Sequence, residues 1–295
     1  MTQEHNILFY SGLLARHQYA FVDRAVVPAE TLEGLPIIPL VPRELRSDAQ
    51  QMPALLPLAP EAPYMERLSV AMKMGEDNAT LDPVDTLIAV APDISQNLLA
   101  SHLTSRLIVH FQRNKAFLRY YSSDIFPHLV RVLPPGYLKS LFGRRGEVQK
   151  WTYRFQGDWI SVPVPYVSEG EGVPNFWAVT AEQRKVLDIA GEINQTLDEY
   201  RAKMGRPWND CQEWEVKARV TEYSIGIAQQ HLSDPDDLKA FALHALTHGE
   251  HFYRHPAIEN ILHNAASSPG AYREATRHLT ENEWAKVAAE ALTQI

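Results

Sequence analysis

The spacing of apolar residues changes once along this chain, on either side of a segment rich in Glu and Gly at 165–174. Before that segment apolar and polar residues alternate, which is typical of strands with one buried face. After it apolar residues recur every three or four positions, which is typical of amphipathic helices. We therefore predict an α+β protein, with a mixed α/β lobe over residues 1–174 and an all-helical lobe over residues 175–295.

Two antiparallel hairpins give the clearest strand signals in the first lobe. The second of them is predicted over 151–164, around Gly157 and Asp158. The first is predicted around a turn at 113–115, and its strands carry the alternating positions Leu107, Val109, Phe111, Phe117, Arg119 and Tyr121. We therefore expect substantial antiparallel pairing in this lobe.

Shorter signals indicate the other elements of the first lobe. The interval 28–63 holds 8 of the chain's 20 prolines, and because proline breaks helices and central strands, we expect edge strands and loops there. Asp93 or Ser95 is expected to cap a helix. The predicted elements are strands at 19–23 and 86–90, a helix over 61–72, and the capped helix, which carries Leu98, Leu99 and Leu103.

Helix signals fill the second lobe. Thr180 and Gln183 form a capping box at the start of an apolar stripe that ends at Gly205 and Pro207. The stripe consists of Val186, Ala190, Ile193, Leu197 and Tyr200. Further helices are predicted at about 210–231, 235–248 and 257–265, and from a second capping box at 280–283 onward.

Composition points to a globular protein of the cytoplasm. Of the 295 residues, 45% are apolar and 22% are charged, which argues against disorder. The longest apolar stretches fall short of the roughly 20 residues that span a bilayer, so no membrane partner is expected. No Lys or Arg precedes the apolar stretch at 7–15, which argues against a signal peptide. The single cysteine excludes an internal disulfide.

The net charge of −8 is unevenly distributed. Residues 106–154 hold 10 Lys or Arg and only 2 acids, whereas the rest of the chain holds 18 basic and 34 acidic residues. Such a basic stretch can steer a charged partner toward a docking surface. Alternatively, its side chains simply face solvent from strands and helices. No nucleic-acid partner is predicted, because the basic residues are scattered among apolar ones rather than gathered in a stripe.

Sequence signatures of catalysis are absent. The chain has neither a Gly-x-Ser-x-Gly nucleophile elbow nor a glycine-rich loop that ends in Lys-Ser or Lys-Thr. Cys211 lies between Trp208 and Trp214 on an apolar helical face, so we expect a buried structural thiol. No catalytic residue and no cofactor is therefore predicted.

Four histidines offer an alternative. His244, His248, His251 and His255 would lie on one face of a continuous helix, where imidazoles on adjacent turns can share a metal ion. Gly249 interrupts that helix, and apolar residues share the same face. We favour a metal-free packing surface and keep a histidine-ligated metal protein or metalloenzyme as the alternative.

Two blocks of sequence resemble a known family. The segment Tyr19-Ala20-Phe21-Val22-Asp23-Arg24-Ala25 resembles the Tyr-Ala-Leu-Leu-Asp-x-Ala opening of the type VI secretion adaptor-chaperones. The family's second block has an Arg-aromatic-aromatic strand, a leucine-rich helix and a Phe-Gly before a tryptophan. Its counterparts here are Phe117-Leu118-Arg119-Tyr120-Tyr121, then Leu129, Leu133, Leu138, Phe142-Gly143 and Trp151. Where the family continues with Asp-Pro-Arg, this chain has Ser122-Ser123-Asp124.

The resemblance implies a function. Such bacterial proteins bind a cognate type VI effector in the producing cell and help to load it onto the VgrG spike, and they are neither secreted nor catalytic. Tyr19, Asp23, Arg119 and Tyr121 match the family's motif positions and are the candidate effector-binding residues. Structural roles stay open for them, as an ion pair across the sheet and as core tyrosines. Arg144 and Arg145, in the basic stretch, are further candidates for docking the effector.

Overall fold

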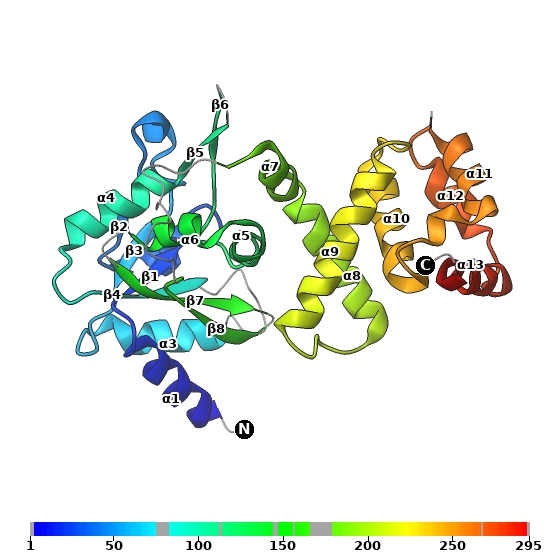
Figure 1. Cartoon of the computed structure of the whole chain (residues 1–295). Coiled ribbons are helices and arrows are strands. Elements are labelled where there is room, and N and C mark those ends of the chain that lie inside the picture. Colours follow the sequence, from blue (N-terminus) through cyan, green and yellow to red (C-terminus); the bar gives the residue numbers. More distant parts are fainter. Residues whose placement is uncertain are drawn as a thin grey trace. The chain divides into compact units, whose positions relative to one another are not determined.

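The computed structural model describes residues 3–74, 83–111, 114–143, 147–155, 157–165, 179–266 and 268–293. Contacts divide the chain into two compact units, Met1–Arg184 and Lys185–Ile295, called here the sheet unit and the helical unit (Figure 1). The predicted α+β class is confirmed, because an antiparallel sheet lies in the N-terminal half and helices make up the C-terminal half. The predicted boundary at residue 174 falls outside the described residues.

The sheet unit is built on six strands in the order β2-β3-β1-β4-β7-β8, and every neighbouring pair is antiparallel. A separate two-stranded sheet pairs β5 with β6. The strands are β1 (Tyr19–Val22), β2 (Ile38–Pro39), β3 (Ala54–Pro57), β4 (Thr86–Val90), β5 (Ile108–Phe111), β6 (Asn114–Phe117), β7 (Val148–Phe155) and β8 (Asp158–Pro163).

Helices cover both faces of the six-stranded sheet, with α1 and α3 on one face and α5 and α6 on the other (Figure 1). The helix α7 (Ala181–Asp188) crosses the boundary between the two units. The other helices of the sheet unit are α1 (Gln3–Leu14), α2 (Ala29–Leu32), the 3-10 helix η1 (Arg43–Asp48), α3 (Tyr64–Met74), α4 (Gln96–Arg106), α5 (Phe126–Val132) and α6 (Pro135–Phe142).

Strand β1 lies in the middle of the unit, and its alternating side chains enter two cores. Ala20 and Val22 are fully buried in a cluster that includes Leu14 and Leu68, from α1 and α3. Phe21 points to the opposite face. There it packs on the ring of Trp151 at 5.3 Å, within an aromatic cluster that also takes side chains from α5 and α6. Both faces of β1 are thus buried, which fits its uninterrupted apolar sequence.

The predicted hairpin at 151–164 is confirmed as β7 and β8, with Phe155 opposite Asp158. Gly157 adopts a φ of 93° beside the turn, a conformation that glycine reaches without strain. The first hairpin also exists, but its predicted register is wrong. The ladder of β5 and β6 continues to the pair Phe111 and Asn114, so that only two residues connect the strands, the commonest hairpin length.

This shorter hairpin changes the setting of two candidate residues. Strand β6 ends at Phe117, so Arg119 and Tyr121 are not strand positions, contrary to the prediction. They lie in the irregular segment between β6 and α5. Their placement is therefore determined by packing against the six-stranded sheet rather than by strand alternation.

One expectation for the early part of the sheet unit is wrong in detail, and another is confirmed. The proline-rich interval contributes β3, which is internal because it lies between β2 and β1. Pro57 is tolerated there because β2 pairs only with Ala54 and Leu55, so the ladder does not need the amide hydrogen that proline lacks. Ser95 caps α4 as predicted, and its hydroxyl accepts a hydrogen bond from the Leu98 amide. Leu99 and Leu103 are buried, but Leu98 is 53% exposed.

The helical unit contains no strand among its described residues. Its helices are α8 (Ala190–Met204), α9 (Cys211–Ala228), α10 (Pro235–His248), the 3-10 helix η3 (Phe252–Arg254), α11 (Pro256–Ala265), α12 (Ala271–Arg277) and α13 (Glu281–Thr293). Both predicted capping boxes form, at Thr180–Gln183 and Thr280–Glu283. The helix expected from 181 to 204 is broken at Ile189, whose backbone angles (φ −104°, ψ 12°) are not helical.

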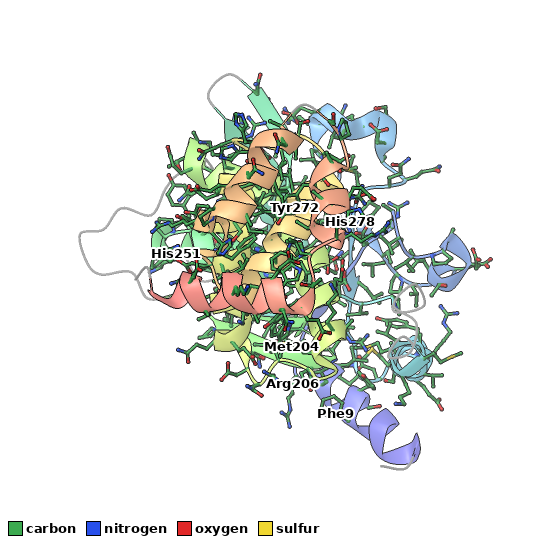
Figure 2. All side chains as sticks on the ribbon, turned by 90° about the vertical axis from the view of Figure 1, so that its right-hand side faces the viewer. Phe9, Met204, Arg206, His251, Tyr272 and His278 are labelled. Atoms are coloured by element: carbon green, nitrogen blue, oxygen red, sulfur yellow. The ribbon has the colours of Figure 1, made fainter. Side chains whose placement is uncertain are left out.

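The core of the helical unit combines aliphatic side chains with three buried aromatic rings. Phe241, Phe252 and Tyr272 are fully buried and come from α10, η3 and α12. Tyr272 lies among the helices of this unit (Figure 2). In the described part of the chain, no helix combines the length and the apolar character needed to cross a membrane.

Candidate functional site

The two sequence blocks that carry the family resemblance meet in the sheet unit. Asp23 follows β1 directly, and the Arg119 side chain reaches it from the segment after β6. The guanidinium Nη2 lies 2.5 Å from the Asp23 Oδ2, so the pair is both hydrogen-bonded and ionic. The Asp23 side chain is 4% exposed and that of Arg119 is 45% exposed. The pair therefore joins a buried carboxylate to a cation at the surface.

Local backbone geometry explains why an aspartate occupies this position. The Asp23 Oδ1 accepts a hydrogen bond from the Ala25 amide at 3.0 Å, and the Asp23 carbonyl accepts from the amides of Val26 and Val27. Aspartate side chains stabilise turns in this way. Burial opposes the charge on Arg119, but the Asp23 carboxylate outweighs this effect and raises the pKa of the guanidinium.

The candidate tyrosines fill the core beside this pair. Tyr121 is buried and stacks on Phe21, with ring centroids 5.7 Å apart and planes 8° apart. Its carbonyl accepts a hydrogen bond from the Thr86 hydroxyl of β4 at 2.7 Å. Tyr19 is half-buried on β1, and burial raises the pKa of its phenol as it does that of Tyr121. The two tyrosines therefore pack in the core beside the ion pair and offer little surface to a partner.

Sequence reasoning missed three further members of the site, Asp85, Asp124 and Arg154. Asp85 immediately precedes β4, and burial raises the pKa of its carboxyl to about 6, with the nearby carboxylates of Asp124 and Asp23 adding to the effect. Arg119 and Arg154 act in the opposite direction. An acidic residue before a buried strand is a weak signal, and no spacing rule connects it with Asp23. The result is a cluster of three carboxylates and two guanidinium groups.

The basic stretch at 106–154 is partly neutralised in the fold. Lys115 forms a 2.8 Å ion pair with Glu44, in addition to the pair of Arg119 with Asp23. Arg106 is buried. The docking candidates Arg144 and Arg145 lie outside the described residues.

The four histidines do not share one helix. Helix α10 ends at His248, because Gly249 adopts a φ of 103° and stops it. His251 lies at the start of η3, and His255 caps α11 by accepting a hydrogen bond from the Ala257 amide. The helical spacing that suggested a shared metal site is therefore lost after the second histidine.

Each histidine has a different environment. Trp284 of α13 packs against His244 and stacks on His248, at centroid distances of 4.4 and 4.2 Å. Burial lowers the pKa of both imidazoles, that of His244 to about 3. His251 lies 3.6 Å from Glu250 and His255 lies 3.4 Å from Glu290. Across the described residues, no group of three or more His, Cys, Asp or Glu side chains is placed to hold a metal ion.

Cys211 is exposed, contrary to the expectation of a buried thiol. It is the first residue of α9, at a capped N-terminal turn that faces solvent. The apolar contacts belong instead to Trp208 and Trp214, which are both buried. The pKa of the thiol is raised, first by partial burial and then by Asp210, so the thiolate form is disfavoured.

Comparisons of the chain with protein-family models, with curated proteins and with solved structures found no match. The resemblance to the secretion adaptors therefore stays a prediction from the two sequence blocks.

Proposed function

We propose that this chain is a non-enzymatic adaptor-chaperone, which binds a cognate type VI effector in the cytoplasm and helps to load it onto the VgrG spike. The observation that carries the proposal is the ion pair between Asp23 and Arg119. These residues belong to the two sequence blocks of the resemblance and are 96 positions apart in the chain. This ion pair is also the structural role left open for the two residues, and it supports the proposal because it brings the two separated sequence blocks together in the fold.

Burial divides the candidate residues by role. Asp23 and Tyr121 are buried, so they position their neighbours and keep the segment after β6 against the sheet. Arg119 is the member that reaches the surface, and it keeps a large exposed fraction beside an acidic cluster. We therefore assign contact with the effector to Arg119 and a positioning role to the buried members. Arg144 and Arg145 extend the same basic stretch along the sequence and serve as further docking residues.

The test uses the bacterium that encodes the chain. Deletion of the gene should leave the neighbouring effector aggregated or undelivered, and the wild-type gene should restore its solubility and delivery. Arg119→Glu should fail to restore them although circular dichroism of the purified variant shows a folded chain. Lys185→Glu is the matched control, because Lys185 is exposed and lies far along the chain from the motif blocks. An effector that stays soluble and is delivered without the gene would refute the proposal.

A further inference from the structure

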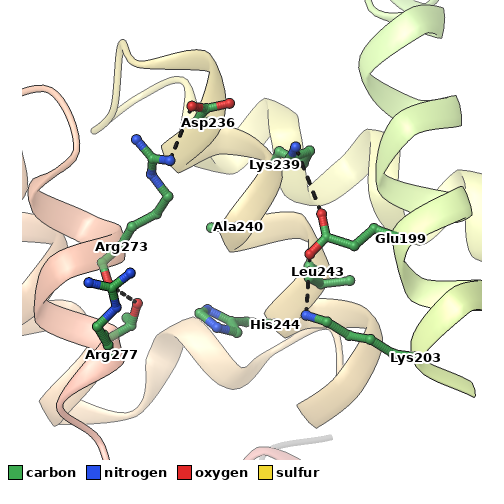
Figure 3. A pocket seen from close by; sticks show the side chains of 10 residues that line it. Glu199, Lys203, Asp236, Lys239, Ala240, Leu243, His244, Arg273 and Arg277 are labelled. Atoms are coloured by element: carbon green, nitrogen blue, oxygen red, sulfur yellow. Dashed lines mark hydrogen bonds and ion pairs between the residues drawn. The ribbon is translucent and has the colours of Figure 1, made fainter.

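A cavity of about 350 Å³ lies in the helical unit, between α8, α10 and α12 (Figure 3). This volume is at the lower end of the range of small-ligand sites, about 300–1,000 Å³. Helix α10 supplies half of its lining residues, and the other two helices form its sides. The lining residues are Glu199, Lys203, Asp236, Lys239, Ala240, Leu243, His244, Arg273, Thr276 and Arg277.

The charge of the lining is opposite to that of its surroundings. Residues 185–295 contain 11 Lys or Arg and 17 Asp or Glu, a net charge of −6. The cavity lining contains four Lys or Arg and two carboxylates, a net charge of +2. Concave sites of one sign concentrate ligands of the other sign. Asp234, Asp237 and Glu274 lie outside the lining and pair with its two arginines, so the excess positive charge of the cavity lies at its lysines.

One side of the cavity has more cations than anions. Lys203 of α8 lies 3.3 Å from Glu199, and Lys239 of α10 lies 3.8 Å from the same carboxylate (Figure 3). Two ammonium groups thus share one carboxylate, which leaves one positive charge in excess. Both ion pairs join partly exposed groups, and such pairs contribute only about 0–1 kcal/mol, so a ligand carboxylate can join Glu199 or replace it as the partner of the lysines.

The opposite side is held more firmly. Arg273 of α12 makes ion pairs with Asp236 at 3.1 Å and with the buried Asp237 at 3.3 Å, which fix its guanidinium. Arg277, one turn further along α12, is 79% exposed and lies 3.5 Å from Glu274. The Arg273 side chain is thus held in place by its carboxylate partners, whereas the exposed Arg277 side chain can turn toward a bound anion.

His244 adds a neutral donor. Its Nδ1 lies 2.8 Å from the hydroxyl of the buried Tyr272. A buried hydroxyl hydrogen needs an acceptor, so the Tyr272 hydroxyl donates to Nδ1 and leaves the hydrogen of the neutral imidazole on Nε2. Because burial lowers the pKa of His244 to about 3, the ring is neutral at pH 7. The ring therefore lines the cavity as an uncharged group that carries its hydrogen on Nε2.

We propose that this cavity binds a carboxylate side chain from an acidic segment of a partner protein, between Lys203, Lys239, Arg277 and the His244 N–H. A singly charged carboxylate matches the single excess charge at the lysine side. A phosphate dianion carries one charge more than this excess and would be repelled more strongly than a carboxylate by Glu199 and Asp236, which also line the cavity. The inference depends on the proposed function only for the identity of the partner. If the chain is an effector chaperone, the acidic segment belongs to the effector.

The test measures binding of a hexaglutamate peptide that carries an N-terminal fluorescein, by fluorescence anisotropy at about 50 mM salt. The double variant Lys203→Gln/Lys239→Gln should weaken binding about tenfold or more. The control Lys185→Gln/Lys286→Gln removes the same charge from exposed positions outside the cavity and should change binding less than about twofold. Near 300 mM salt the wild-type affinity should fall, because the contacts are partly exposed.

Three outcomes would overturn the inference. One is a wild-type chain that does not bind hexaglutamate, and another is an equal loss of binding in the two double variants. The third is inorganic phosphate bound by the wild type while the peptide is not. Circular dichroism should show that the variants fold. This is expected because the Lys203 side chain is 59% exposed and that of Lys239 is 32% exposed. The peptide assay does not require the effector, so its failure is distinguishable from failure of the chaperone proposal.

Discussion

Replacing Arg119 by methionine should destabilise the sheet unit by about 2 kcal/mol, because the change leaves the Asp23 carboxylate buried without its cation. Breaking a fully buried ion pair costs about 3–5 kcal/mol, whereas a fully exposed pair contributes about 0–1 kcal/mol. Asp23 is 4% exposed and Arg119 is 45% exposed, so the expected loss lies between these limits. Methionine keeps most of the apolar stem, which restricts the effect to the charge.

The assay is hydrogen exchange of the β1 and β4 segments in increasing urea, which follows the sheet unit alone. With a denaturant slope of about 1–3 kcal/mol/M, the midpoint should fall by about 1 M. The double variant Asp23→Asn/Arg119→Met should recover about 1 kcal/mol, because asparagine removes the orphaned charge and keeps the acceptor for the Ala25 amide. A loss below about 0.5 kcal/mol in Arg119→Met, or strictly additive single changes, would refute the reasoning.

Three other predictions concern stability. Gly143→Ala should cost about 1–2 kcal/mol because its φ is 96°, whereas Gly226→Ala, in an open helical position, should stabilise by about 0.5–1 kcal/mol; urea unfolding of both variants checks this. Burial and neighbouring carboxylates raise the pKa of Asp85 from 3.8 to about 6, so its contribution is favourable below about pH 4 and is lost as the pH rises through 6. Asp85→Asn should therefore raise the unfolding free energy at pH 7.5 by about 2 kcal/mol and flatten its dependence between pH 4 and 6; a destabilised variant would contradict this. Trp284→Ala should cost about 2–3 kcal/mol and expose α13 to hydrogen exchange, whereas Lys286→Ala on the exposed side of α13 should not.

Elements with strong local signals were predictable from the sequence. Alternation around Gly157 identified the hairpin of β7 and β8, and the two capping boxes located the starts of α7 and α13. Each of these signals acts within a few residues, where backbone conformation and side-chain hydrogen bonds decide the structure. The interruption of the histidine helix at Gly249 was visible for the same reason.

Features that depend on contacts between distant segments were not predictable in this way. No spacing rule shows that β3 lies inside the sheet, because strand order is determined by packing across the whole unit. The short helix α12 carries no clear apolar period, yet its Tyr272 enters the core of the helical unit. Asp85 joined the cluster around Asp23 only through the pairing of β4 with β1. Only the family resemblance had connected Asp23 with Arg119.

The central claim is that the chain binds a cognate effector. Its most direct test is co-expression with the neighbouring effector and VgrG genes, followed by size-exclusion chromatography with mass measurement of the eluted species. The account predicts a stable complex of the chain with one effector, retained by Lys185→Glu and weakened by Arg119→Glu. Separate elution of the chain from every neighbouring product, with the effector soluble alone, would contradict the account.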